Sequence, residues 1–299
     1  MEREQLGYLP ARDGAPLYAA YHAPAQAQAG AAVLICPPLF EERKSAYAAL
    51  RKLALRLAAV GHAVLRFDYR GSGESGGSSA GRRWLHLAED ATAAREKLAR
   101  LSGREDVVLL GLRLGATLAL WSAAAGRRSS FSSGAAGLKA VIALAPILNG
   151  AAQVRQWKLR SKIRAELTDG GGTAFQAVKD HGQDARATDG GGTAFQAVKD
   201  HGQDARATID FDGYEVHPGF FDDVAALDLL QAPPAAPGPA LVVQLSHRSE
   251  PSLESKQFVA AWGGKAELKC LRVEPFWDKL DDVDTRPLED MVCGWVSSF

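Results

Sequence analysis

The sequence predicts an α/β protein in which helices cover both faces of a mostly parallel sheet. Compact apolar runs at residues 31–36, 63–67, 107–110 and 138–144 alternate with stretches that have helical spacing. That alternation is typical of strands joined by crossover helices. At 299 residues and 46% hydrophobic composition, the chain can fill one large core.

The first half of the chain begins with a predicted hairpin. Two short runs, Gln5 to Leu9 and Pro16 to His22, flank a turn signal at Asp13-Gly14. The predicted elements that follow are a strand from Ala31 to Cys36, a helix from Leu50 to Val60 ended by Gly61, a strand from Ala63 to Phe67, a Gly/Ser loop from Asp68 to Ala80, and a helix from Trp84 to Leu101.

The second half continues the alternation and then interrupts it after Pro146. The predicted elements are a strand from Val107 to Leu110, a helix from Ala116 to Ala124, a strand from Leu138 to Leu144, a basic helix from Gln153 to Leu167, a helix from Asp222 to Leu230, a strand from Ala240 to Leu245, a helix from Ser252 to Trp262, a strand from Glu267 to Val273, and a helix from Arg286 to Val296.

An exact tandem repeat lies within the interruption. Residues 168–187 read TDGGGTAFQAVKDHGQDARA, and residues 188–207 repeat them letter for letter. Each copy has four glycines and only Phe and Val as large apolar residues, which is too little to offset the entropy of ordering. We therefore predict a disordered insertion in a cap region at 147–221, with the core formed by 1–146 and 222–299.

Composition limits the possible partners. Basic and acidic residues balance at 35 each, so no overall field recruits nucleic acid or an anionic membrane. No apolar run is long enough to span a bilayer, the first residues are polar, and the three cysteines are dispersed. These features predict a cytoplasmic protein without membrane insertion. Metal-ligand spacing is absent, and no cofactor is expected.

The join between strand and helix at Gly111-Leu112-Arg113-Leu114-Gly115 has the frame of a nucleophile elbow, G-x-S-x-G. In enzymes with such an elbow, the sharp turn lifts one side chain above the sheet edge. Their catalytic triad follows along the chain in the order Ser, Asp/Glu, His. Here Arg113 replaces the serine, and no histidine follows His247. Glu250 is a candidate for the acid position, although it has no late base to orient.

The glycines Gly71, Gly73 and Gly76 also match the dinucleotide pattern G-x-G-x-x-G, with Asp90 as a candidate ribose-binding acid. A dinucleotide site needs these glycines to open a helix directly. Several small residues intervene before Trp84, which disfavours this alternative.

Four segments carry a resemblance to a known family. They are Pro37-Pro38 with Glu41-Glu42 and Ser45, Asp68-x-x-Gly-x-Gly-x-Ser, Gly111-Leu-Arg-Leu-Gly-Ala, and Glu274-Pro-Phe-Trp. Together they resemble the α/β-hydrolase family called exosortase A system-associated hydrolase, second type. The resemblance covers most of the chain except the repeat. It implies an α/β-hydrolase-like fold with a cap after the sixth strand, in a cytoplasmic protein encoded with exosortase and exopolysaccharide genes and linked to export and surface anchoring of sorted proteins.

Arg113 leaves two interpretations open. A guanidinium at a helix N-terminus can bind an anion, together with the amides of Leu39 and Leu114. Alternatively, Arg113 forms a structural ion pair with Glu41 or Glu42. The candidate ligand-binding residues are therefore Arg113, Leu114, Leu39, Phe40, Glu41 and Glu42.

Two functions follow from these interpretations. The first is a hydrolase of an unknown ester, amide or thioester with a degenerate triad. The second is a catalytically inactive accessory protein that binds a small anionic molecule or a partner. The sequence leaves the oligomeric state open.

Overall fold

The computed structural model describes residues 4–25, 30–125, 137–168, 197–198, 208–231, 238–247, 250–262, 265–279 and 283–298. The chain divides into two compact units. The first unit comprises Met1–Gly77, Leu85–Leu148 and Asp228–Phe299, and the second comprises Ser78–Trp84 and Asn149–Leu227. Among the described residues, no helix combines the length and apolar character needed to cross a membrane.

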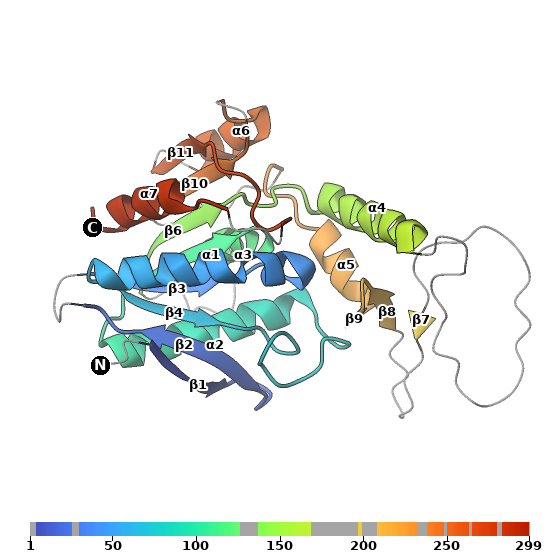
Figure 1. The fold of residues 1–299 in the computed structure, drawn as a ribbon, viewed down its shortest axis with the longest axis horizontal. Helices are drawn as coiled ribbons and strands as arrows, with labels where there is room; N and C mark the ends of the chain where they lie inside the picture. Colours follow the sequence, from blue (N-terminus) through green and yellow to red (C-terminus); the bar gives the residue numbers. More distant parts are fainter. Residues whose placement is uncertain are drawn as a thin grey trace, which may run out of the picture. The chain divides into compact units, whose positions relative to one another are not determined.

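The first unit is built on an eight-stranded sheet with the order β1-β2-β4-β3-β5-β6-β10-β11 (Figure 1). The strands are β1 (Glu4–Pro10), β2 (Pro16–His22), β3 (Ala32–Cys36), β4 (Ala63–Phe67), β5 (Val107–Leu112), β6 (Leu138–Leu144), β10 (Ala240–Leu245) and β11 (Ala266–Leu271). The pairs that involve β2 are antiparallel, and all the other pairs are parallel. The predicted mostly parallel α/β sheet is confirmed.

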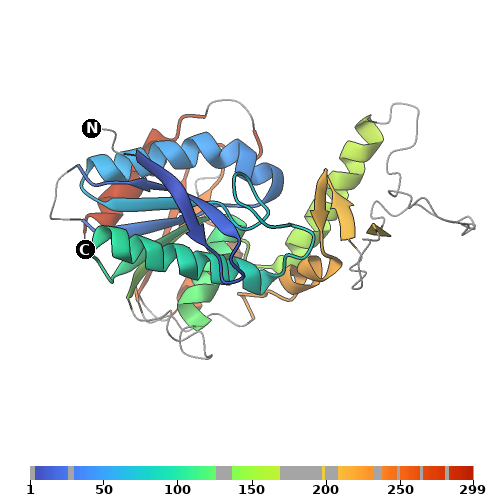
Figure 2. The same cartoon turned by 90° about the horizontal axis from the view of Figure 1, so that it is seen from below.

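Helices cover both faces of this sheet. Figure 2 shows α1 (Phe40–Ala59) on one side and α2 (Trp84–Ser102) on the other. α3 (Leu114–Ala125), α6 (Leu253–Ala261) and α7 (Arg286–Val296) complete the unit. The core on the α1 side joins alternate residues of the central strands to the apolar faces of α1 and α7, including Ile35, Leu110, Leu53 and Val292.

The second unit has its own aromatic core. It contains α4 (Gly150–Thr168), α5 (Pro218–Ala225), and a small sheet of β7 (Ala197–Val198), β8 (Thr208–Phe211) and β9 (Tyr214–Val216). Four buried rings pack edge to face or tilted, with centroids 5.4 to 6.4 Å apart: Trp157, Phe211, Phe220 and Phe221. Since aromatic side chains bury large areas, these rings hold α4, α5 and the hairpin together.

Most predicted elements occur near their expected bounds, but the bounds predicted for one helix are wrong. The helix expected at Asp222 to Leu230 is α5, which begins at Pro218 and ends at Ala225. The His217 side chain accepts a hydrogen bond from the Gly219 amide, and proline at the first position fixes the start. Beyond the helix end, Asp228 accepts the amides of Leu230 and Gln231, a local turn that competes with helix.

Two further features differ from the expectation. α1 begins at Phe40, ten residues before the predicted start at Leu50, so Glu41 and Glu42 lie in its first turn. The hairpin β8–β9 was not predicted, although its turn residues, Asp212 and Gly213, both have positive φ (53° and 84°), as two-residue hairpin turns require. The repeat at 168–187 and 188–207, apart from Thr168 and β7, lies outside the described residues, and so does its predicted disorder.

Candidate functional site

The turn between β5 and α3 has the sharp geometry that the sequence predicts. Arg113 has φ of 55°, in the left-handed region that bulky side chains rarely adopt. A Cβ at Gly111 would collide with the backbone of Gly115 and Ala116, and one at Gly115 would collide with the carbonyl oxygens of Cys36 and Pro37. Both glycines are therefore required because backbone passes where a side chain would begin.

The strain extends to the two neighbouring strands. Phe40, four residues after β3, has φ of 56°, and Ala145, directly after β6, has φ of 44°. Because β3, β5 and β6 are adjacent and parallel, all three strained residues follow the carboxyl ends of neighbouring strands. This edge is where open α/β sheets bind ligands, and strained backbone concentrates at such sites.

Among the described residues, Arg113 contacts Glu42, Ala145 and Trp277. Its Nε and Nη2 each donate to Glu42 Oε1 at 3.4 Å, and Nη1 donates to the Ala145 carbonyl at 3.3 Å. The guanidinium carbon lies 5.4 Å from the centroid of the Trp277 ring, a cation–π distance. The Arg113 side chain is 15% exposed and that of Glu42 is 9% exposed. The two charges therefore neutralise each other in a largely desolvated place, through hydrogen bonds longer than optimal.

The other candidate residues lie at different places in the structure. Leu39 is the N-cap of α1, Phe40 is its buried first residue, and Leu114 is the first residue of α3. Glu41 pairs with Lys44 at 2.8 Å, so it is Glu42 and not Glu41 that meets Arg113. Glu250 is exposed in the connection between β10 and α6.

Trp277 occupies the segment after β11, where the fold would place a base. It lies in the sequence Glu274-Pro-Phe-Trp, is 6% exposed, and stacks edge to face on Phe276. His247, which follows β10, is exposed. No sequence pattern links Trp277 to Arg113, because their contact joins segments far apart in the chain.

Three other polar or reactive groups have structural roles. Ser75 Oγ donates to the Asp68 carbonyl and accepts the Tyr18 amide, which fixes the glycine loop against β2. Asp90 is fully buried and accepts three hydrogen bonds of 2.6 to 2.9 Å from Arg70, so it cannot reach a ribose. Burial raises the pKa of the Cys36 thiol to about 12, which keeps it protonated near neutral pH.

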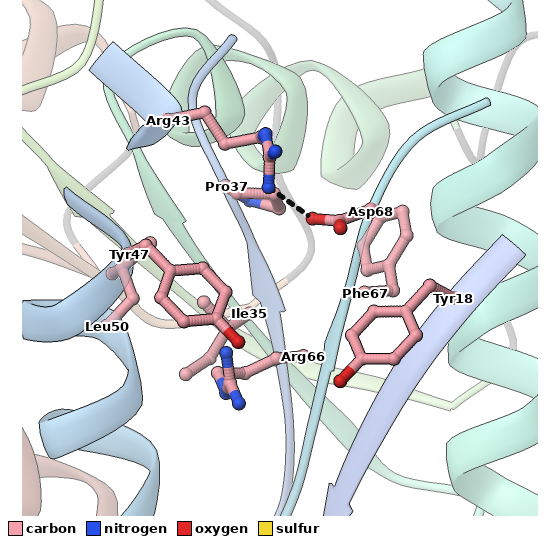
Figure 3. A pocket seen from close by; sticks show the side chains of 9 residues that line it. All are labelled: Tyr18, Ile35, Pro37, Arg43, Tyr47, Leu50, Arg66, Phe67 and Asp68. Atoms are coloured by element: carbon pink, nitrogen blue, oxygen red, sulfur yellow. Dashed lines mark hydrogen bonds and ion pairs between the residues drawn. The ribbon is translucent and has the colours of Figure 1, made fainter. Parts of the chain in front are cut away.

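A small pocket lies beside the first turns of α1 (Figure 3), with a cavity volume of about 20 Å³. Its wall carries Tyr18, Tyr47 and Arg66, and an ion pair at its rim joins Arg43 Nη1 to Asp68 Oδ1 at 2.9 Å. The volume accommodates a water-sized group. Neighbouring residues of α1 therefore serve two ion pairs, Glu42 with Arg113 and Arg43 with Asp68. The pair of Arg43 with Asp68 was not predicted from the sequence.

Arg66, in the wall of this pocket, is held by hydrogen bonds to two residues. Its Nε donates to His22 Nε2 at 3.1 Å, and its Nη2 donates to Glu4 at 2.9 Å. Its guanidinium lies 5.2 Å from the centre of the Tyr47 ring. Burial, assisted by the Arg66 charge, lowers the pKa of His22 to about 4, so this imidazole is neutral near pH 7.

The fold and the strand-to-helix turn define a protein of the α/β-hydrolase class, and the comparisons agree. The family model described as serine aminopeptidase, S33, matches residues 25–187, more than half of the chain. The chain belongs to this family of α/β hydrolases. No curated protein matches it.

Solved structures support the same fold. The esterase domain of a Rhodothermus marinus protein is 19% identical, with a TM-score of 0.60 over 99% of this chain and 98% of that one. The α/β hydrolase GrgF from Penicillium sp. sh18 is 16% identical, with a TM-score of 0.63 over 99% and 98%. A ferulic-acid-bound protein from Butyrivibrio proteoclasticus is 18% identical, with a TM-score of 0.58 over 98% and 96%. At these identities the likeness extends to the fold alone.

Proposed function

We propose that this chain is a member of the hydrolase family that binds rather than hydrolyses. The observation that carries the proposal is Arg113 at the apex of the turn, ion-paired to Glu42 and stacked on Trp277. A guanidinium stays protonated in proteins and offers only donors, so it can act neither as a nucleophile nor as a base. In subtilisin, loss of the triad serine or histidine alone lowers turnover by about 2 × 10⁶. Substitution at both positions is therefore expected to remove triad hydrolysis.

A serine-directed fluorophosphonate probe and a panel of activated esters and thioesters test the proposal. We expect no labelling and no turnover above the Arg113→Ala variant, with an intact esterase as positive control. Turnover by the wild type that Arg113→Ala abolishes would instead support the alternative, a hydrolase of an ester, amide or thioester, which family membership favours.

The ligand class proposed for this site is a small anion. Arg113 is partly exposed, its hydrogen bonds to Glu42 are long, and the N-terminus of α3 adds a favourable field. An anionic group would compete with Glu42 for the guanidinium. The Glu42→Gln variant removes that competitor, so calorimetric titration with acetate and phosphate should give tighter binding than to the wild type. Binding that survives in Arg113→Ala would contradict this site.

The cellular setting proposed is the exosortase and exopolysaccharide system, as an accessory protein in the cytoplasm. It is supported by the resemblance of the Pro-Pro-x-x-Glu-Glu and Gly-Leu-Arg-Leu-Gly segments. Deleting the gene in its host should impair surface anchoring of sorted proteins, and the Arg113→Ala gene should fail to restore it. Restoration by that variant would remove Arg113 from the function.

A further inference from the structure

Helix α4 buries one face and exposes the opposite one. Within the second unit, Val154, Trp157 and Ser161 are buried, and Trp157 packs on Phe211 and Phe221. Their spacing of three and four residues defines a single helix face. That face attaches α4 to its unit and fixes which side chains point outward.

Two large apolar side chains lie on the outward face. Leu159 is 59% exposed and Ile163 is 46% exposed. They are four residues apart, so they are neighbours on one stripe, and at about 3.6 residues per turn that stripe lies opposite Trp157 and Ser161. Among the described residues, α4 is thus a helix whose solvent side carries an apolar stripe in its middle.

Basic side chains flank this stripe on both sides, and all of them are exposed. Arg155, Lys158 and Lys162 lie on one flank, and Arg160 and Arg164 lie on the other. Glu166 is the only acidic residue of α4. Asp212 pairs with Arg164 at 3.1 Å. The chain as a whole is neutral, so α4 concentrates positive charge that the overall balance conceals.

We propose that the outward face of α4 docks on an anionic lipid surface, with the helix lying in the plane of the interface. Leu159 and Ile163 would enter the boundary between headgroups and acyl chains, while the basic side chains reach back to the headgroups. The exposed side of α4 combines an apolar stripe with basic flanks, a combination that helices lying in a lipid interface use, and it does not require a membrane span. Two apolar side chains are too small a core for a stable protein interface, which buries about 800 Å² on each partner.

Co-sedimentation of the full-length protein with vesicles tests the proposal. We expect binding to vesicles that mix phosphatidylcholine with phosphatidylglycerol, weak binding to phosphatidylcholine alone, and release at high salt. The Leu159→Ser/Ile163→Ser variant should bind at least about tenfold more weakly. The Lys158→Glu/Lys162→Glu variant should bind at least about twentyfold more weakly.

Matched controls separate this face from general properties of the surface. Leu253 is 70% exposed on α6, and Leu253→Ser should leave binding unchanged. Lys256 and Lys265 are exposed outside α4, and Lys256→Glu/Lys265→Glu changes the net charge by the same amount as the α4 charge variant. Circular dichroism and thermal unfolding check that every variant folds.

Three outcomes would overturn the proposal. The first is no binding of the wild type to the anionic vesicles. The second is equal loss of binding in the α4 and control charge variants, which would indicate a response to net charge alone. The third is α4-dependent binding to polyglutamate without binding to vesicles, which would assign this face to an acidic protein partner.

Discussion

Two arginines of the first unit follow the carboxyl ends of parallel strands, and they are held in different ways. Arg70, after β4, donates to Asp90 at 2.6 and 2.9 Å and to Asp13 at 2.8 Å. Arg113, after β5, donates to Glu42 at 3.4 Å from a backbone with φ of 55°. Arg70 is 7% exposed and Arg113 is 15% exposed. Among the described residues, the short hydrogen bonds of Arg70 to Asp90 indicate a structural brace, whereas the long hydrogen bonds of Arg113 to Glu42 favour exchange of that partner.

The largest loss of unfolding free energy is expected from substitution of Arg70. Arg70→Leu leaves the carboxylate of Asp90 buried without its cation, and breaking such a pair costs about 3–5 kcal/mol of unfolding free energy. Urea denaturation measures the loss. The Arg70→Leu/Asp90→Leu variant should recover part of it, because no uncompensated charge remains.

A surface arginine provides the control for Arg70. Arg286 is 82% exposed and pairs with Asp284, so Arg286→Leu should leave the denaturation midpoint unchanged. If Arg70→Leu were equally silent, Arg70 would not be a brace and the contrast with Arg113 would fail.

The backbone at Gly115 passes close to the backbone of Cys36 and Pro37, and this contact fixes the position of Arg113. In Gly115→Ala the new methyl meets the carbonyl oxygens of Cys36 and Pro37, which belong to the backbone and cannot rotate away. We expect a loss of about 3 kcal/mol in unfolding free energy, the upper range for overpacking. Gly294, in α7, has nothing within 4 Å of a built Cβ, so Gly294→Ala should stabilise the protein by up to about 1 kcal/mol. Equal responses at the two positions would exclude the tight turn.

A third arginine, Arg66, has a neutral partner in addition to a carboxylate, which gives it a pH dependence. Its Nε donates to His22 Nε2, so protonation of that nitrogen would remove the acceptor. The pKa of His22 is about 4 in the folded protein, against 6.5 for the free side chain. The unfolded chain therefore binds the proton first: this contribution to stability is fully present above pH 6.5 and is lost as the pH falls toward 4.

The expected loss from His22 is at most about 3 kcal/mol, at about 1.4 kcal/mol for each pKa unit. Urea denaturation across this pH range measures it. His22→Gln keeps an acceptor for Arg66 but cannot titrate there, so its stability should fall less steeply with acid. An identical slope in the variant and the wild type would show that other groups cause the acid sensitivity.

Local features of the site around Arg113 could be predicted from the sequence, whereas its tertiary contacts could not. The turn around Arg113 is predictable because Gly111 and Gly115 report a local steric requirement, and periodicity likewise locates the strands. The sequence leaves the partner of Arg113 open between Glu41 and Glu42, because the choice depends on the rotation of α1 and hence on its start at Phe40. The stacking of Trp277 depends on tertiary packing, which no local pattern encodes.

The smallest expected difference in stability tests the backbone strain at Arg113 itself. Arg113→Ala and Arg113→Gly both remove the guanidinium, so they lose the same contacts to Glu42, Ala145 and Trp277. They differ in one methyl group, at a position whose φ of 55° favours glycine. We therefore expect the glycine variant to be more stable than the alanine variant by about 1 kcal/mol in urea denaturation.

Ala152, exposed in the first turns of α4, is the control with the opposite sign, because Ala152→Gly should cost up to about 1 kcal/mol in a helix. An alanine variant at position 113 that is as stable as the glycine variant would mean that the turn relaxes once the arginine is gone. In that case the contacts of the guanidinium, rather than the two flanking glycines, would hold the backbone in its left-handed conformation. The assignment of the turn as rigid independently of Arg113 would then be reversed.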